Sequence, residues 1–259
     1  MRLAYVRHRG IRHNPGSTAA VVEGSQVKLV RGGPLGRYVQ TGETAPLSDV
    51  QLLSPVPRPS KIVAIGINYQ THAGEGTAPA QPEPFLKAPS SLIGHEQTIL
   101  LPPDAERVDA EAEVVAVIGR RARNISEAEA DRHIAGYTCG NDVSARDWQR
   151  GDLQWWRAKS ADTFTAAGPW IETELGPEDL HLVGRLNGKI VQDASTTELV
   201  HSIRKCIAYI SRAMTLEPGD MVFTGTPGTT VQLHAGDVFE VEVAGVGVLR
   251  NPVEAAPEV

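Results

Sequence analysis

The sequence is poor in cysteine, and this excludes two classes of small, covalently stabilised protein. Only Cys139 and Cys206 occur in 259 residues, and they form no C-x-x-C pair. Two cysteines are too few for a disulfide framework, and zinc sites built from cysteine need more ligands at closer spacing. The chain is therefore expected to depend on a hydrophobic core and to reside in a reducing compartment, the cytoplasm.

An excess of basic residues and long apolar runs are also missing. The chain has 25 Lys and Arg against 31 Asp and Glu, which gives a formal charge of −6. Binding to a nucleic-acid backbone requires a positive surface, so no nucleic-acid partner is expected. Apolar runs such as residues 114–118 are much shorter than a bilayer span, and the Arg-containing N-terminus lacks the apolar stretch of a signal peptide. No membrane partner is expected either.

The sequence does contain enough apolar residues for a sizeable core, with 41% hydrophobic and 22% charged residues. This length allows one large domain or two small ones. Residues 1–57 contain short strand patterns separated by Gly, Asn and Pro, which predicts a small N-terminal strand-rich domain. The proline-containing segment 54–59 is interpreted as a linker to a second domain over residues 58–254. The N-terminal strand patterns occupy residues 3–6, 19–22 and 27–30.

Strand patterns dominate the rest of the chain. Near-continuous apolar runs predict buried strands at residues 61–67 and 108–118. The pair Asn187-Gly188 predicts a hairpin within residues 182–191, and a final hairpin is expected through Ala244-Gly245.

Helix patterns are fewer. Ser126 and Glu129 form a capping box, which predicts a short helix that ends at Gly136. Between residues 198 and 214, apolar residues recur every three or four positions and predict an amphipathic helix. Because strands outnumber helices and do not alternate with them, the sequence predicts an α+β architecture with mixed sheets and few helices, not a doubly wound fold.

Carboxylates near the strand predicted at residues 108–118 indicate a metal site. Side chains alternate along a strand, so Glu111 and Glu113 point the same way. Two carboxylates on a partly buried face repel each other unless they are neutralised, and a hard divalent cation is the usual partner. Asp142 can add a third oxygen ligand, a set that selects Mg, Mn or Ca over zinc or copper. The alternatives are a solvated strand end for the glutamates and a turn or helix cap for Asp142.

Four further polar residues lie in segments that can reach such a site. His72 and Glu75 are three positions apart, so on a helix the carboxylate can orient the imidazole and raise its basicity. The glycines around them suit a lid that closes over a substrate, or simply a mobile loop with a structural histidine. Lys159 is either a surface charge or an anion holder. Thr226 belongs to a turn that can also form a carboxylate-binding nest.

Taken together, these segments resemble the fumarylacetoacetate hydrolase family from about residue 61 to residue 253. The resemblance depends on several motifs that occur in order. They are Gly-Ile-Asn-Tyr with His72-Ala73-x-Glu75, Phe85-Leu86-Lys87-Ala88-Pro89-Ser90, Glu111-x-Glu113, Asn141-Asp142-Val143-Ser144-Ala145-Arg146-Asp147, Lys159-Ser160-x-Asp162-Thr163-Phe164 and Thr224-Gly225-Thr226-Pro227. The chain resembles a short-chain bacterial-type member, and the resemblance implies that residues 58–254 are the catalytic domain.

The resemblance implies a fold, a cofactor and an assembly. The family fold is a mixed β-sandwich roll, and its members are usually dimeric, so a homodimer is expected. Glu111, Glu113 and Asp142 match the family's Mg²⁺ or Mn²⁺ ligands. The residues implied as catalytic are Lys159 and the lid dyad of His72 and Glu75, which positions or activates water. The residues implied to hold the oxygen atoms of an oxo-acid substrate are Arg146, Gln149 and Thr226.

The implied activity is metal-dependent cleavage of a carbon–carbon bond in a small 2-oxo acid. An acylpyruvate hydrolysis or an oxaloacetate-type decarboxylation would both proceed through an enolate, with the divalent ion as Lewis acid. The alternative is isomerisation or tautomerisation of a 2-hydroxy-diene-dioate in aromatic-acid breakdown, and a different class is a non-catalytic metal-dependent binding protein. The loop after Pro227 is shorter and more polar than in many hydrolase members, and residues 1–57 match no motif of the family.

Overall fold

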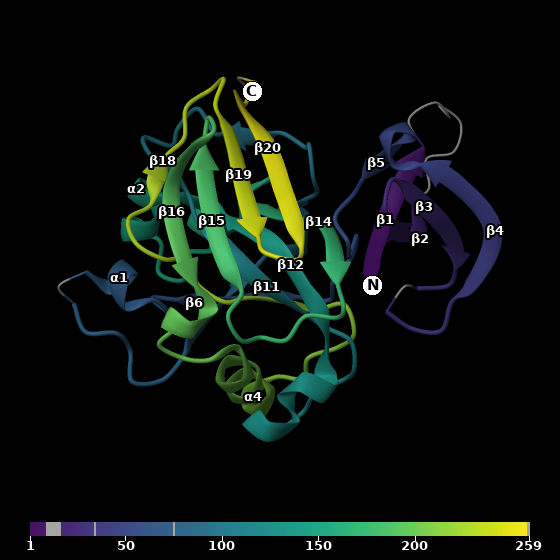
Figure 1. Cartoon of the computed structure of the whole chain (residues 1–259). Helices are drawn as coiled ribbons and strands as arrows, with labels where there is room; N and C mark the ends of the chain where they lie inside the picture. The colour runs from purple at the N-terminus through teal and green to yellow at the C-terminus, as the bar shows by residue number, and fades with distance from the viewer. Residues whose placement is uncertain (9–16, 34, 75, 258–259) are drawn as a thin grey trace.

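Five short strands form the N-terminal part of the molecule. The computed structural model describes residues 1–8, 17–33, 35–74 and 76–257, and its strands β1 to β4 pair antiparallel in chain order. Their bounds are β1 (Arg2–His8), β2 (Thr18–Glu23), β3 (Gln26–Arg31), β4 (Val39–Pro46) and β5 (Val50–Leu52). A 3-10 turn, η1 (Leu47–Asp49), leads into β5, which pairs with β1. Figure 1 shows these purple strands beside the rest of the chain.

Strand β1 connects this region to the rest of one large sheet. It pairs antiparallel with β14 (Thr165–Glu172), which places Leu3 opposite Ile171. The sheet runs in the order β4-β3-β2-β1-β14-β12-β11-β17-β6-β7, with β5 on β1 and β8 on β14. Its other strands are β12 (Ile134–Asp142), β11 (Ala112–Ile118), β17 (Met221–Phe223), β6 (Ile62–Gly66), β7 (Glu83–Lys87) and β8 (Leu92–Ile93). The sheet is mixed, because β17 pairs parallel to β6 and β8 parallel to β14.

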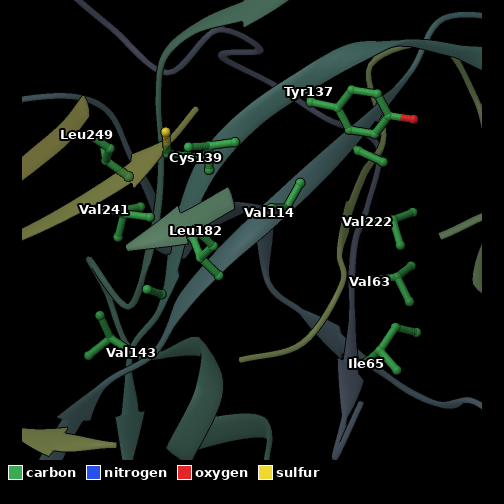
Figure 2. Close-up of a cluster of buried hydrophobic side chains, with 14 of the residues drawn as sticks. Val63, Ile65, Val114, Tyr137, Cys139, Val143, Leu182, Val222, Val241 and Leu249 are labelled. Atoms are coloured by element: carbon green, nitrogen blue, oxygen red, sulfur yellow. The ribbon is translucent and has the colours of Figure 1, made fainter. Parts of the chain in front are cut away.

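A second sheet covers the centre of the first. It contains β16 (Lys189–Ser195), β15 (His181–Leu186), β19 (Val238–Val243), β20 (Gly247–Ala255) and β9 (Ile99–Leu101). Strands β15, β19 and β20 lie against β11, β12 and β14. Figure 2 shows the buried side chains between the layers, including Val114, Cys139, Leu182, Val241 and Leu249. Because β11 is buried on both faces, its sequence is a continuous apolar run instead of an alternating one.

The remaining elements are short and lie at the ends of the sheets. A small third sheet contains β13 (Ser144–Ala145), β10 (Val108–Ala110) and β18 (Val231–Gln232). The helices are α1 (Gln70–Ala73), α2 (Arg146–Gly151), α3 (Trp156–Ser160) and α4 (Ile203–Ala213), and the other 3-10 segments are η2 (Pro89–Ser91), η3 (Glu127–His133) and η4 (Thr196–Glu198). Among the described residues, no helix has the length and apolar content needed to cross a membrane.

The predicted fold class is confirmed. The structure is α+β, with strands in mixed sheets, two of them packed face to face, and few helices. The hairpin predicted at Asn187-Gly188 connects β15 to β16, and both residues have positive φ as a type I′ turn requires.

Three predicted elements have different bounds. The strand predicted at residues 108–118 is two strands, β10 and β11, which belong to different sheets and meet at Glu111. The amphipathic helix begins at Ile203 and not at residue 198, because Ser202 caps it by accepting a hydrogen bond from the Lys205 N–H at 3.1 Å.

The capping box of Ser126 and Glu129 is present, but it starts a 3-10 helix that ends at His133, before Gly136. Gly136 lies inside β12 instead. A Cβ atom there would be 2.3 Å from the carbonyl oxygen of Glu172 on β14, so this glycine permits close strand packing and does not end a helix.

Candidate metal centre

The change of sheet between β10 and β11 creates the acidic site. At this junction the Asp142 N–H donates to the Glu111 carbonyl at 3.0 Å, and the Glu111 N–H donates to the Asn141 side chain at 2.9 Å. These bonds hold Glu111 against the end of β12, where Asp142 is the last residue. Glu113 is the second residue of β11, so all three carboxylates meet at one end of the central sheet.

The three predicted metal ligands form one buried cluster. Carboxylate oxygens of Glu111, Glu113 and Asp142 lie within 4.8 Å of one another, and each residue is at most 3% exposed. The structure therefore brings together the predicted set, and the burial of Glu111 and Glu113 excludes the alternative of a solvated strand end.

Three cations are packed around this cluster. The Lys159 ammonium donates to Glu111 at 2.7 Å and to Asp142 at 2.8 Å. Lys87 donates to the other oxygen of Asp142, and Arg146 donates to the other oxygen of Glu111. Two of the three carboxylates thus have ammonium or guanidinium partners on both oxygens.

Among the described residues, no ammonium or guanidinium group donates a hydrogen bond to the third carboxylate, Glu113. Its carboxylate accepts one hydrogen bond, from the Gly225 N–H at 2.7 Å. Burial and the nearby charges of Asp142 and Glu111 raise its pKa well above the usual value. For Glu111, burial acts in the same direction, but the Lys159 ammonium and the Arg146 guanidinium outweigh it and hold its pKa well below the usual range.

This donor set fits a hard divalent cation. The only candidate ligands in the cluster are carboxylate oxygens, which suit Mg²⁺ or Mn²⁺. Burial of the Glu113 carboxylate without a cationic partner is costly, and a divalent ion would supply the missing positive charge. Three protein ligands would also leave positions open for substrate or water.

His72 lines the same cavity as the acidic cluster. It is in the four-residue helix α1, which ends at Ala73 because Gly74 takes a left-handed φ of 60°. The predicted pairing of His72 with Glu75 on one helical face stays a prediction, because Glu75 lies outside the described residues. The His72 Nδ1 atom is 2.7 Å from the carbonyl oxygen of Gly228. A carbonyl only accepts, so Nδ1 carries a proton, and in the neutral imidazole the lone pair is then on Nε2.

The three residues predicted to bind the substrate also line this cavity. Arg146 and Gln149, on α2, are joined by a hydrogen bond of 2.9 Å. Thr226 follows β17 and accepts a hydrogen bond from Gln192 at 2.7 Å. The cavity has a volume of about 260 Å³, which suits a small acid. It is lined by Ile65, Gly66, Ile67, His72, Ala73, Phe85, Glu111, Glu113, Asp142, Arg146, Gln149, Trp155, Lys159 and Thr226.

The sequence analysis assigned no role to two buried residues that hold the site together. Lys87 is fully buried and connects Asp142 to the backbone carbonyl of Lys159. It belongs to a motif that was recognised, but it ends a mostly exposed strand that also contains Glu83, so its local sequence does not mark it as buried. Gln192 lies on a strand of the second sheet, and nothing in its local sequence distinguishes it from a surface glutamine.

Two family models match this chain. A family model described as fumarylacetoacetate (FAA) hydrolase C-terminal matches residues 61–254, and one described as Rv2993c-like, N-terminal matches residues 1–55. The chain is 39% identical over 222 residues to the mitochondrial oxaloacetate tautomerase FAHD2A of Homo sapiens, covering 80% of this chain and 71% of that protein.

Two solved structures extend the comparison. A 5-carboxymethyl-2-hydroxymuconate delta-isomerase from Mycobacterium smegmatis is 41% identical with a TM-score of 0.91, covering 99% of this chain and 100% of that chain. A maleylpyruvate hydrolase from Sphingobium sp. SYK-6, in complex with manganese(II) ion and pyruvate, is 28% identical with a TM-score of 0.82 and the same coverage. The named reactions differ, although the fold is shared.

Proposed function

The chain belongs to the fumarylacetoacetate hydrolase family of enzymes, and on that premise we propose that it catalyses metal-dependent proton transfer on a small 2-oxo acid. The specific reaction proposed is the keto–enol tautomerisation of an oxaloacetate-like substrate. Two similar proteins at about 40% identity carry the names of a tautomerase and an isomerase, which supports this choice over bond cleavage.

The observation that carries the proposal is the hydrogen bond from His72 Nδ1 to the Gly228 carbonyl. In the neutral imidazole this bond places the lone pair on Nε2, so His72 can act as a base at the cavity that contains the acidic cluster. A tautomerase needs one such base, which removes the proton from C3 of the substrate. The imidazolium formed in this step can return the proton to the 2-oxo oxygen, which completes the enol.

The surrounding side chains suit the charge that develops on that oxygen. A divalent ion held by Glu111, Glu113 and Asp142 would supply Lewis-acid polarisation of the substrate oxygen atoms. Lys159 holds an ammonium group beside the same cluster, and Arg146 holds a guanidinium at the cavity wall. The buried ammonium and the partly buried guanidinium stabilise an anionic oxo-acid and the enolate derived from it.

The test follows the enol absorbance of oxaloacetate with Mg²⁺ or Mn²⁺, after EDTA treatment, and with product analysis by NMR. Metal-dependent interconversion above the uncatalysed rate, without fragments, is expected. His72→Ala should lower this rate by about 100-fold or more with a much smaller change in metal affinity, because His72 is not one of the three carboxylates that would hold the ion. Full turnover of His72→Ala would contradict the role of this residue as base.

Carbon–carbon bond cleavage, the reaction first predicted, remains the second candidate. It is favoured by the manganese- and pyruvate-bound maleylpyruvate hydrolase, which shares the fold at 28% identity. Acylpyruvates would be the substrates to test, and two fragments would identify this reaction. No conversion of any 2-oxo acid in the presence of either metal would contradict both candidates.

A further inference from the structure

Gln192 reaches from the second sheet into the catalytic region. It lies on β16 opposite Gly184 of β15 and is 4% exposed. A Cβ atom at Gly184 would lie 3.1 Å from the Gln192 Oε1 atom and 3.1 Å from the Ala112 Cβ atom. The glycine therefore leaves the space through which the Gln192 side chain passes to β11.

All the hydrogen-bonding atoms of the Gln192 amide are engaged at the site. Its Oε1 accepts from the Ala112 N–H at 2.9 Å, and Ala112 stands between Glu111 and Glu113. Because a backbone N–H can only donate, this bond fixes which end of the amide is oxygen. Its Nε2 therefore donates to the Thr226 hydroxyl oxygen at 2.7 Å and to the Pro227 carbonyl at 2.7 Å.

The first of these donations sets the direction of the Thr226 hydroxyl. The Thr226 oxygen accepts from Gln192, so its own proton is free to be donated elsewhere. Thr226 lines the cavity, where the acceptor would be an oxygen atom of an anionic substrate. With the amide in this orientation, Thr226 acts as a donor to the substrate.

The second donation connects Gln192 to the base. The residue after Pro227 is Gly228, whose carbonyl accepts from His72 Nδ1 at 2.7 Å and whose N–H donates to the Thr71 hydroxyl at 3.1 Å. The loop from Thr226 to Gly228 is thus held by Gln192 on one side and by α1 on the other. A shift of this loop would move the Gly228 carbonyl, which is the acceptor that keeps the proton on His72 Nδ1.

We infer that Gln192 is a positioning residue that orients the Thr226 hydroxyl and, through the Pro227-Gly228 segment, holds His72 in the tautomer with Nε2 as base. It touches neither the substrate nor the reacting atoms in this role. The inference rests on the proposed function for the use of His72 and Thr226. The tautomer of His72 is a property of the free protein and can be measured without turnover.

The first experiment uses Gln192→Glu, which preserves shape and keeps the acceptor for the Ala112 N–H. A carboxylate cannot donate, so Thr226 must turn its proton toward it, and the Pro227 carbonyl loses its donor. The expected result is a KM for oxaloacetate raised about tenfold, because a buried donor to an anion is lost. In ¹⁵N NMR, the His72 ring should change from a single Nδ1–H tautomer to a mixture.

The second experiment combines this variant with His72→Ala. If Gln192 acts on kcat through His72, Gln192→Glu should lower kcat about tenfold in the wild type and less than twofold in the His72→Ala background. An equal fold-loss in both backgrounds would show that Gln192 acts by another route and would overturn the inference. A wild-type tautomer spectrum in Gln192→Glu would overturn it as well.

Asn251→Asp is the matched control. The buried Asn251 amide also donates to two backbone carbonyls, those of Gly94 at 2.9 Å and Gln97 at 2.7 Å, but it does not line the catalytic cavity. The Asn251→Asp variant should have a lower free energy of unfolding but unchanged kcat, KM and His72 spectrum. If Asn251→Asp changed kcat, KM and the His72 spectrum as much as Gln192→Glu does, the effect of Gln192 would be a general structural one. If the wild type converts no 2-oxo acid, the proposed function fails, while the His72 spectra of the two variants still decide the role of Gln192.

Discussion

The two ends of strand β11 carry buried carboxylates with opposite surroundings. At one end the Ile118 N–H donates to the Asp220 carbonyl at 2.9 Å, which holds Asp220 beside the strand. At the other end lie Glu113 and the acidic cluster. Asp220 is fully buried and Glu113 is 1% exposed, so burial alone does not distinguish the two sites.

The hydrogen-bond partners do distinguish them. Asp220 accepts from the Ser60 hydroxyl at 2.6 Å, the Lys61 N–H at 3.0 Å and the Glu217 N–H at 2.7 Å, and it forms an ion pair with the Lys61 ammonium. Glu113 accepts only from the Gly225 N–H among the described residues. A carboxylate with all its lone pairs occupied stabilises the fold, whereas one with lone pairs left open can bind a ligand.

The largest expected effect is a loss of stability when Asp220, the fully bonded carboxylate, is replaced. Asp220→Ala leaves two backbone N–H groups and a hydroxyl without their acceptor and removes the partner of Lys61. We expect the free energy of unfolding to fall by about 3–5 kcal/mol. Metal affinity of the folded protein should not change. The measurement is chemical denaturation with calorimetric metal titration, and weaker metal binding in this variant would contradict the division between the two ends of β11.

Glu113→Gln should give the reverse pattern. Loss of one charged ligand should weaken Mg²⁺ or Mn²⁺ binding by about 100-fold or more and abolish turnover. The stability of the metal-free protein should not fall, because the native carboxylate is buried with a raised pKa and costs stability when it is ionised.

The pH dependence of that cost has a definite sign. Because the folded-state pKa of Glu113 lies above its usual value of 4.5, folding takes up a proton between these two values. Stability of the metal-free wild type should therefore fall as pH rises from about 4.5 through the raised pKa, and this component should be absent in Glu113→Gln. The measurement is the melting temperature of the wild type and of Glu113→Gln as a function of pH in EDTA. Parallel profiles would contradict the assignment of this pH dependence to Glu113.

The sequence predicted the members of the site better than their arrangement. Glu111 and Glu113 could be proposed because carboxylates beside an apolar run are costly without a partner, whereas Asp142 was assigned through the family resemblance. The break at Glu111 could not be predicted, since an unbroken strand and two strands in different sheets have the same apolar pattern. The early end of α1 depends on the conformation of Gly74, which a single glycine in a polar loop does not reveal.

Contacts between distant segments account for the other omissions. Gln192 and Thr226 are brought together by the packing of the two sheets, and no local pattern encodes that contact. Asp220 follows Pro218-Gly219 directly before a strand, and that local pattern predicts only a turn. Its partners Ser60 and Lys61 lie about 160 positions earlier in the sequence, so its role as a fully bonded buried carboxylate could be seen only in the fold.

A smaller effect is expected from two buried threonines in different settings. Thr226→Val removes a hydroxyl that faces the cavity and should raise KM about tenfold through loss of one hydrogen bond to an anion. Thr138→Val is the control, because among the described residues the buried Thr138 hydroxyl has no hydrogen-bond partner. That change should increase stability by about 1 kcal/mol and leave KM unchanged. A raised KM in the control would mean that loss of a buried hydroxyl, and not its contact with substrate, causes the effect.

The smallest effect is expected at Cys139, which lies on β12 opposite Val114, the residue of β11 that follows Glu113. Burial raises its pKa to about 12, and burial likewise raises the pKa of Cys206 to about 12. Thiols react as thiolates, so iodoacetamide at pH 8 should label neither residue in the folded protein and both in guanidinium. Mass spectrometry of the intact chain measures this. Rapid labelling of Cys139 in the native protein would mean that the core around β11 opens to solvent. The difference between Asp220 and Glu113 could then not be attributed to their partners within a closed core.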